Sequence, residues 1–494
     1  MQAQILINGE VSDGAVELRA VLNPARRTEV VGHYPAATAR HADAAVAAAT
    51  SAFAAWSTST ASQRAEMMLA AADALEDGNE ERAELLTREH GKTLSEAAHD
   101  VAGASKILRY YAGLASRLNE PQQTESELGR IEKRLRPMGP MAVIVPWNAP
   151  VYLAYLMIAP ALLAGNTVVV KPPSYTPLAL WDTLSILDQQ LPDGVVNVVP
   201  GSGAEVGGAL ARHPKIRGIR FTGSTETGKE LMRQAADTVK NIGLELGGND
   251  PAIVLEGATI SDQLISEVLR GVYAGTGQIC YNIKRLYVHQ SHHDEFVSRF
   301  TAAVSDLTVG NGLDSEVTMG PLNNEAQYRF VNELIDRTKS AGAHVDTVGT
   351  RHSSTDWDQG WFVLPSVVTG LSHGDELVEC EQFGPVVPII PFETPEEAVT
   401  MANESEFGLA ASVWDDDVDH AFEVAGAIEA GTVFVNVHRI GASDVAMEFG
   451  GFKQSGIGRG HGWVAVEECS ELQVIAHRPG WVEATSRADG HSRR

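Results

Sequence analysis

From about residue 140 onward, short runs of β-branched residues alternate with stretches of helical character. The first series of strand-like runs has glycine or proline close by and covers 141–145, 167–170, 195–199, 216–221 and 252–255. A second series has a helix at 292–305 and strand-like runs at 285–289, 345–348, 386–391, 411–414 and 432–436. Strands that alternate with helices form parallel βαβ units, because the crossover helix returns the chain to the same end of the sheet. The sequence therefore predicts an α/β fold with two α/β domains, each built from such units.

Other segments complete the expected organisation. Apolar residues recur at helical spacing between 40 and 115, which predicts helices there. The segment 118–136 is polar and charged and is interpreted as an arm, while 472–476 is strand-like. The tail after about 478 is polar, and we expect it to fray. With 494 residues the chain is too long for one hydrophobic core, so several domains are expected.

The charge balance argues against several classes of partner. The formal net charge is -26, whereas a nucleic-acid binder needs a basic face, so we expect no nucleic-acid partner. The same charge repels anionic membranes. The uncharged stretch 137–170 is long enough to span a bilayer, but prolines and asparagines interrupt it. A buried strand–loop–helix–strand unit is favoured over a membrane span.

Cysteine usage indicates a reducing compartment. The three cysteines are Cys280, Cys380 and Cys469, and so small and odd a number is no disulfide framework. No pair has CxxC spacing, so no metal site is predicted. The N-terminus lacks the basic start and long apolar core of a signal peptide. We therefore expect a cytoplasmic protein without a resident metal.

Three residues are candidates for catalysis. Cys280 follows two glycines that let backbone approach a ligand closely, and a thiolate is a strong nucleophile. Glu245 lies between leucines, where apolar surroundings raise a carboxylate pKa towards that of a general base. Asn148 lies in a proline-bounded turn after a strand, where its amide can donate to an oxyanion. The structural alternatives are an inert buried cysteine, a surface glutamate and a plain turn.

Phosphate-binding signals follow the same strands. Lys171 ends a strand, 200–207 is a glycine-rich turn into a helix, and 221–229 follows a strand and opens a helix. The last segment matches the GxxxxGK start of a P-loop, yet residue 230 is Glu where a P-loop needs Ser or Thr for magnesium. A nucleotide-hydrolysing function is therefore disfavoured.

The order of motifs along nearly the whole chain resembles the NAD(P)-dependent aldehyde dehydrogenase superfamily. The matching segments are PWNAP at 146–150, VVVKP at 168–172, FTGSTETG at 221–228, LELGGNDP at 244–251, GQIC at 277–280, GWFVLPSVV at 360–368, EQFGPVVP at 381–388, FGLAASVW at 407–414 and FGGFKQSGIGR at 449–459.

The resemblance implies oxidation of an aldehyde to a carboxylic acid. Cys280 is similar to the family's nucleophile, Glu245 to its general base and Asn148 to its oxyanion donor. The positions that resemble cofactor-contacting ones are Val145, Pro146, Trp147, Lys171, Ser174, Gly203, Gly207, Phe221, Gly223, Ser224, Thr227, Leu246, Glu381 and Phe383. The reaction would pass through a thiohemiacetal and a thioester on Cys280, and Glu245 would activate the water that releases the acid.

Two positions depart from the family pattern. Ser174 stands where a glutamate often holds the adenosine ribose, which removes a repulsion against a 2′-phosphate. NAD and NADP both remain open as cofactors, with NAD as the first choice. Cys380 stands where a glutamate is common, and packing is favoured over catalysis as its role.

Four residues fall at positions that line the family's substrate tunnel: Ala149, Ile279, Tyr281 and Phe449. Ala149 replaces a common aromatic residue, which should widen the tunnel. Arg439 lies in a loop that often touches the distal end of the substrate, where it would suit a semialdehyde carboxylate. A solvent-facing arginine is the favoured alternative, and the aldehyde's identity stays open.

The family's architecture implies three parts. We expect a Rossmann-like dinucleotide-binding domain from 1–117 and 138–247, an α/β catalytic domain from 248–447, and a β arm for oligomerisation from 118–137 and 463–480, followed by a flexible tail at 481–494. A homodimer or homotetramer is implied. Transfer of the thioester to coenzyme A and a non-catalytic relative are the alternatives, and intact Glu245, Cys280 and Asn148 argue against both.

Overall fold

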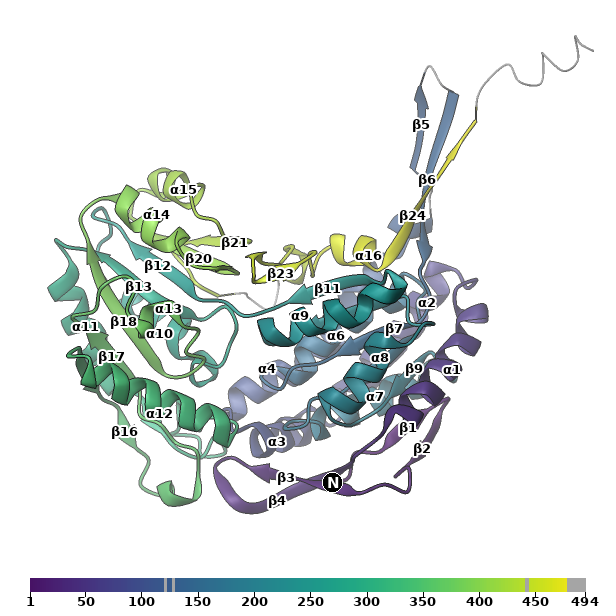
Figure 1. The fold of residues 1–494 in the computed structure, drawn as a ribbon, viewed down its shortest axis with the longest axis horizontal. Helices are drawn as coiled ribbons and strands as arrows, with labels where there is room; N and C mark the ends of the chain where they lie inside the picture. The colour runs from purple at the N-terminus through teal and green to yellow at the C-terminus, as the bar shows by residue number, and fades with distance from the viewer. Residues whose placement is uncertain (120–121, 127–128, 440–443, 478–494) are drawn as a thin grey trace, which may run out of the picture.

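The computed structural model describes residues 1–119, 122–126, 129–439 and 444–477. Its larger sheet has eight strands in the order β2-β1-β9-β8-β7-β10-β11-β23 (Figure 1). The five strands β9, β8, β7, β10 and β11 run parallel to one another. The strands are β1 (Ile5–Ile7), β2 (Glu10–Ser12), β7 (Met141–Ile144), β8 (Val168–Lys171), β9 (Val196–Val198), β10 (Gly218–Thr222), β11 (Asn241–Glu245) and β23 (Gly456–Ile457).

Helices cover both faces of this sheet because side chains alternate between the faces along each strand. In β7, Met141 and Val143 pack into one core, while Ala142 and Ile144 pack into another. The first core includes residues of α2 (Ala61–Glu76), α3 (Asn79–His90), α4 (Leu94–Gly113), α6 (Pro150–Leu163) and α7 (Leu178–Gln189). The second includes residues of α1 (Ala39–Trp56), α8 (Gly208–Arg212) and α9 (Thr225–Ala235).

A second sheet has seven strands in the order β15-β17-β18-β13-β12-β20-β21, and only β15 is antiparallel. These strands are β12 (Asp250–Val254), β13 (Ile283–His289), β15 (His344–Thr347), β17 (Ser366–Thr369), β18 (Val386–Phe392), β20 (Ala410–Trp414) and β21 (Thr432–Val435). Its helices are α10 (Asp262–Tyr273), α11 (His293–Ser305), α12 (Glu325–Ser340), α13 (Glu376–Glu379), α14 (Pro395–Asn403) and α15 (Val418–Ala425).

A three-stranded sheet projects from the body of the molecule (Figure 1). It consists of β5 (Gln122–Ser126), β6 (Gly129–Pro137) and β24 (Ser470–Ala476), and β24 and β5 are its two edge strands. Small elements complete the fold: α5 (Ser116–Asn119), α16 (Val464–Glu468) and the strand pairs β3 (Leu18–Asn23) with β4 (Arg26–Pro35), β14 (Thr308–Val309) with β16 (Thr350–Arg351), and β19 (Phe407–Gly408) with β22 (Phe452–Lys453).

The predicted alternation of strands and helices is confirmed, and each strand-like run overlaps a strand. In the two large sheets, five strands were not predicted: β1, β2, β11, β17 and β23. The uncharged stretch forms β7, α6 and β8, as expected, and among the described residues no helix is both long and apolar enough to cross a bilayer. The predicted tail at 481–494 lies outside the described residues. The larger sheet also takes β23 from beyond both ranges assigned to the dinucleotide-binding domain.

Candidate active site

Cys280 follows a turn whose backbone is unusual. After α10 the chain turns through Gly275 and Thr276, both left-handed with φ of 60° and 61°. Gly277 is also left-handed, and a Cβ there would lie 2.3 Å from the Gly384 carbonyl oxygen, so only glycine fits. The turn leaves Cys280 half-buried ahead of β13.

Burial raises the pKa of the Cys280 thiol to about 12, and the carboxylates of Asp250, Glu245 and Glu381 raise it further. The charge of Lys284 opposes this effect. The Cys280 thiol is therefore neutral near pH 7, and it needs added positive charge or a base to become a thiolate.

Asn148 is buried between the end of β7 and the start of α6. Its Nδ2 donates to the backbone carbonyl of Gln278 over 3.0 Å, which brings the amide to the loop that carries Cys280. The fold thus brings Asn148 to within two residues of Cys280 along the chain, through a contact between residues 130 positions apart.

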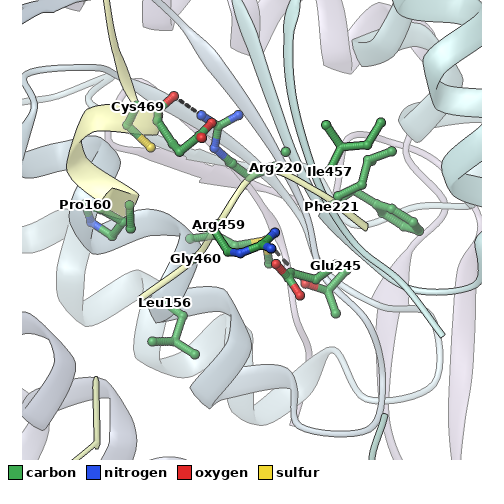
Figure 2. Close-up of a pocket in the computed structure, with 15 residues that line it drawn as sticks. Leu156, Pro160, Arg220, Phe221, Glu245, Ile457, Arg459, Gly460 and Cys469 are labelled. Atoms are coloured by element: carbon green, nitrogen blue, oxygen red, sulfur yellow. Dashed lines mark hydrogen bonds between the residues drawn. The ribbon is translucent and has the colours of Figure 1, made fainter. Parts of the chain in front are cut away.

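Glu245 ends β11 and lines a partly open pocket with about 430 Å³ of empty space (Figure 2). Leu156 and Met157 of α6 supply apolar lining, and Arg459 lies beside the carboxylate. Burial raises the pKa of Glu245 well above its usual range, and the charge of Arg459 lowers it in part. Since a general base works best with a pKa near the working pH, this environment suits Glu245 for proton transfer.

The candidate dinucleotide groove lies where β7, β8, β9 and β10 end, the edge at which open α/β sheets bind ligands. Lys171 is buried there, and burial lowers its pKa to about 8. Gly207 lies over it, since a Cβ would be 3.7 Å from the lysine Cδ, while a Cβ on Gly203 would meet nothing within 4 Å. Because neither glycine carries a side chain, both leave room for the phosphates of a dinucleotide.

The N-terminus of α9 faces the same region. Ser224 caps α9, and its hydroxyl donates to Thr227 Oγ1 over 2.9 Å. Free N–H groups at a helix N-terminus attract phosphate. The P-loop-like Lys229 instead pairs with Glu226 at 2.9 Å on the surface, which agrees with the weak case for a nucleotide-hydrolysing site. Together with Lys171 and the two glycines, these groups fit a dinucleotide.

Other predicted cofactor residues divide into clusters. Pro146 is half-buried, and the N–H of Val145 donates to the Lys171 carbonyl. The rings of Trp147 and Phe383 lie edge to face at 5.6 Å. The Glu381 carboxylate accepts from the Gly248 N–H over 3.1 Å. Leu246 packs against Gly228, and Gly223 packs against Phe221, which also lines the Glu245 pocket. Ser174 lies beside Tyr175 in a cleft separate from that pocket.

The predicted tunnel residues are only partly brought together. The rings of Tyr281 and Phe449 meet edge to face at 6.0 Å, and Ile279 packs against Gly275. Ala149 is half-buried just ahead of α6. Arg439 is half-exposed and pairs with Glu267 at 3.3 Å, so this guanidinium already has a carboxylate partner.

Sequence reasoning missed three charged residues near the site. Lys284 lies inside the fully buried β13, and its Nζ is 5.3 Å from the centre of the Phe383 ring. Asp250 is buried at the start of β12, and Arg459 lies beside Glu245. Two adjacent cations, Lys284 and Arg285, at the start of an apolar run were the available signal, because such charges are rarely buried without partners. Within the described residues, no His, Cys, Asp or Glu side chains gather in threes or more to hold a metal ion.

Comparisons with known proteins agree with this geometry. The family model "Aldehyde dehydrogenase family" matches residues 11–475. The putative aldehyde dehydrogenase DhaS of Bacillus subtilis is 36% identical over 457 residues, covering 92% of this chain and 91% of that protein. The mitochondrial succinate-semialdehyde dehydrogenase of Oryza sativa is 37% identical, covering 92% and 85%. The NAD+ complex of an aldehyde dehydrogenase from Bacillus cereus superposes with a TM-score of 0.91 at 34% identity, covering 97% of each chain. The chain therefore belongs to the aldehyde dehydrogenase family and is an NAD(P)-dependent enzyme that oxidises aldehydes.

Proposed function

We propose that Cys280, Asn148 and Glu245 carry out the oxidation in this enzyme. The Cys280 thiol releases its proton to water and its sulfur attacks the aldehyde carbon, and the Asn148 amide with the Cys280 N–H binds the oxyanion of the resulting thiohemiacetal. Loss of hydride from the thiohemiacetal carbon, to the nicotinamide that a bound dinucleotide would supply, leaves a thioester on Cys280. Water then attacks the thioester on Cys280 while Glu245 takes its proton, and the acid leaves with the thiol restored. The contact of Asn148 with the Cys280 loop is the observation that supports this assignment best.

Two variants test the assignment. Cys280→Ala is expected to abolish aldehyde-dependent formation of reduced cofactor, and wild-type turnover in this variant would overturn the proposed role. Glu245→Gln removes the base but leaves the nucleophile, so a single burst of reduced cofactor should remain while steady turnover falls by about 100-fold or more. Product analysis with coenzyme A present separates hydrolysis from acyl transfer, and acyl-CoA as the main product would contradict hydrolysis.

For the cofactor, we propose that the enzyme uses NAD and also accepts NADP. Ser174 adds no carboxylate of its own to the cleft that it lines with Glu325 and Glu333, so a 2′-phosphate meets no further repulsion from residue 174. Ser174→Glu is expected to raise the KM for NADP by about tenfold or more through like-charge repulsion, with a smaller effect on NAD. An unchanged ratio of kcat/KM for the two cofactors would contradict this role.

For the substrate, we propose a tunnel lined by Ala149, Ile279, Tyr281 and Phe449 that accepts uncharged aldehydes. The aromatic pair of Tyr281 and Phe449 supports apolar contact, and the pairing of Arg439 with Glu267 argues against recognition of a substrate carboxylate. A panel of aliphatic, aromatic and carboxylated aldehydes tests this proposal. A carboxylated semialdehyde with the highest kcat/KM would refute it.

The larger organisation is also proposed. The ranges 1–117 with 138–247 and 248–447 form the dinucleotide-binding and catalytic domains, and the three-stranded sheet holds copies together as a homodimer or homotetramer. Exposed Leu472, Val474 and Ile475 on the edge strand β24 support association. The three free cysteines support a cytoplasmic location, which fractionation of cells would test.

A further inference from the structure

One face of α4 reaches both halves of the candidate site. Glu96 and Asp100 are four residues apart and so lie on the same face of this helix, which belongs to the larger sheet's layer (Figure 1). Glu96 contacts the turn that precedes Cys280, and Asp100 contacts the segment that carries Asn148.

Glu96 has two tasks. Its Oε2 accepts from the Thr93 N–H over 2.9 Å and completes the capping box at the start of α4. Its Oε1 accepts from the Gly275 N–H over 2.7 Å, a contact between residues 179 positions apart. Capping alone accounts for the first bond but not for the second.

The Gly275 turn is one that the backbone does not adopt unaided. Thr276 is β-branched and left-handed, a conformation that persists only where surrounding contacts enforce it. The Thr276 hydroxyl donates to the Gly320 carbonyl over 3.1 Å, and the Gln278 amide donates to the Gly275 carbonyl over 3.0 Å. Glu96 fixes the remaining N–H of Gly275.

Asp100 holds the other half. Its Oδ1 accepts from the Tyr152 N–H over 2.7 Å in the first turn of α6. The residue before this helix, Ala149, has no polar side-chain atom that could cap it. Its Oδ2 pairs with Lys92 Nζ at 2.8 Å, and the same Nζ donates to the Asn148 carbonyl over 2.8 Å. Both partners of this ion pair are buried, so Asn148 has a fixed backbone.

We propose that Glu96, Asp100 and Lys92 are positioning residues that set the Asn148 amide and the Cys280 turn at their catalytic separation. The two halves meet where Asn148 Nδ2 donates to the Gln278 carbonyl, two residues before Cys280. A misplacement of about 1 Å costs roughly 100-fold in rate, so an anchor remote from the substrate still controls the reaction. This inference rests on the proposed roles of Cys280 and Asn148.

The test compares Glu96→Ala with Thr93→Ala in the full-length enzyme. Each removes one half of the capping box, but only Glu96→Ala removes the bond to Gly275. We expect similar losses in Tm, whereas the burst rate of reduced cofactor falls about tenfold or more only in Glu96→Ala, with KM for the cofactor unchanged. Glu96→Gln retains an acceptor oxygen and should recover most of the rate. Burst rates in Glu96→Ala and Thr93→Ala that agree within about twofold would overturn the inference.

A double-mutant cycle with Asn148→Ala separates positioning from general destabilisation. If Glu96 acts by aligning the oxyanion donor, Glu96→Ala should lower the burst rate by less than about threefold once that donor is gone. A full additive loss would overturn the inference. A wild-type burst rate in Asn148→Ala alone would instead remove the proposed role of Asn148, so the two failures are distinguishable.

Discussion

At the scale of single residues, the charge beside Glu245 influences the pH range in which this proposed general base is ionised. Burial raises the Glu245 pKa, and the Arg459 guanidinium opposes that rise because it favours the ionised carboxylate. Glu245 must be ionised to accept a proton from water, so the rate of hydrolysis rises with pH through the Glu245 pKa.

Arg459→Met removes this positive charge and should raise the Glu245 pKa further. The midpoint of the pH–rate profile for thioester hydrolysis is expected to move up by about one unit, measured by quenched flow after the burst. Arg459→Lys keeps the charge and serves as the matched control, with an unchanged midpoint. A downward shift in Arg459→Met, or equal shifts in both variants, would contradict the electrostatic role.

At the scale of elements, the buried side-chain amide of Asn166 joins segments that are far apart in the sequence. Asn166 Oδ1 accepts from the N–H groups of Met138 and Gly139 over 2.7 and 3.1 Å, between β6 and β7. Its Nδ2 donates to the carbonyls of Ala161 in α6 and Cys469 beside β24 over 3.2 and 2.7 Å. Every donor and acceptor of this side chain is thus in use.

Asn166→Ala leaves the N–H groups of Met138 and Gly139 and the Cys469 carbonyl without the partner that Asn166 supplies, and it should lower the free energy of unfolding by about 3 kcal/mol. Denaturant titration followed by circular dichroism measures the change. Asn332→Ala is the control, because Asn332 makes one bond, to the Tyr328 carbonyl one turn earlier on α12, and a loss below about 1 kcal/mol is expected there. Equal losses in the two variants would show that the four hydrogen bonds of Asn166 do not stabilise the fold more than the one bond of Asn332.

At the scale of the whole molecule, β24 exposes apolar side chains to solvent, which is unfavourable for a monomer. Leu472 is 62% exposed and Val474 is 55% exposed on this edge strand. A long exposed apolar edge is a template for pairing with another chain.

Val474→Lys puts a charge on this edge and should shift the assembly towards the 52.8 kDa monomer in light scattering. Val418→Lys is the control: Val418 is 49% exposed at the start of α15, which lies at the opposite end of the molecule from the three-stranded sheet (Figure 1). An unchanged mass for Val474→Lys, or a monomer in both variants, would contradict association through β24.

The sequence predicted the parallel strands and the region of the site because both rest on local signals. Runs such as 141–145 carry continuous apolar and β-branched residues, and the segments around Cys280, Glu245 and Asn148 keep a recognisable order. The strand β11 escaped prediction because Gly243 interrupts it and most of its side chains are only half-buried, so it lacks the apolar run of a central strand.

The sequence by itself thus determined the fold class, the family resemblance and the chemical types of the candidate catalytic groups. Only the tertiary structure decided that Arg459 faces Glu245, that Arg439 is paired with Glu267, and that Glu96 holds the Gly275 turn. The physical reason is one of range. Periodicity and each single motif are encoded within a few residues, whereas a hydrogen bond between residues 179 positions apart depends on how separately formed layers pack.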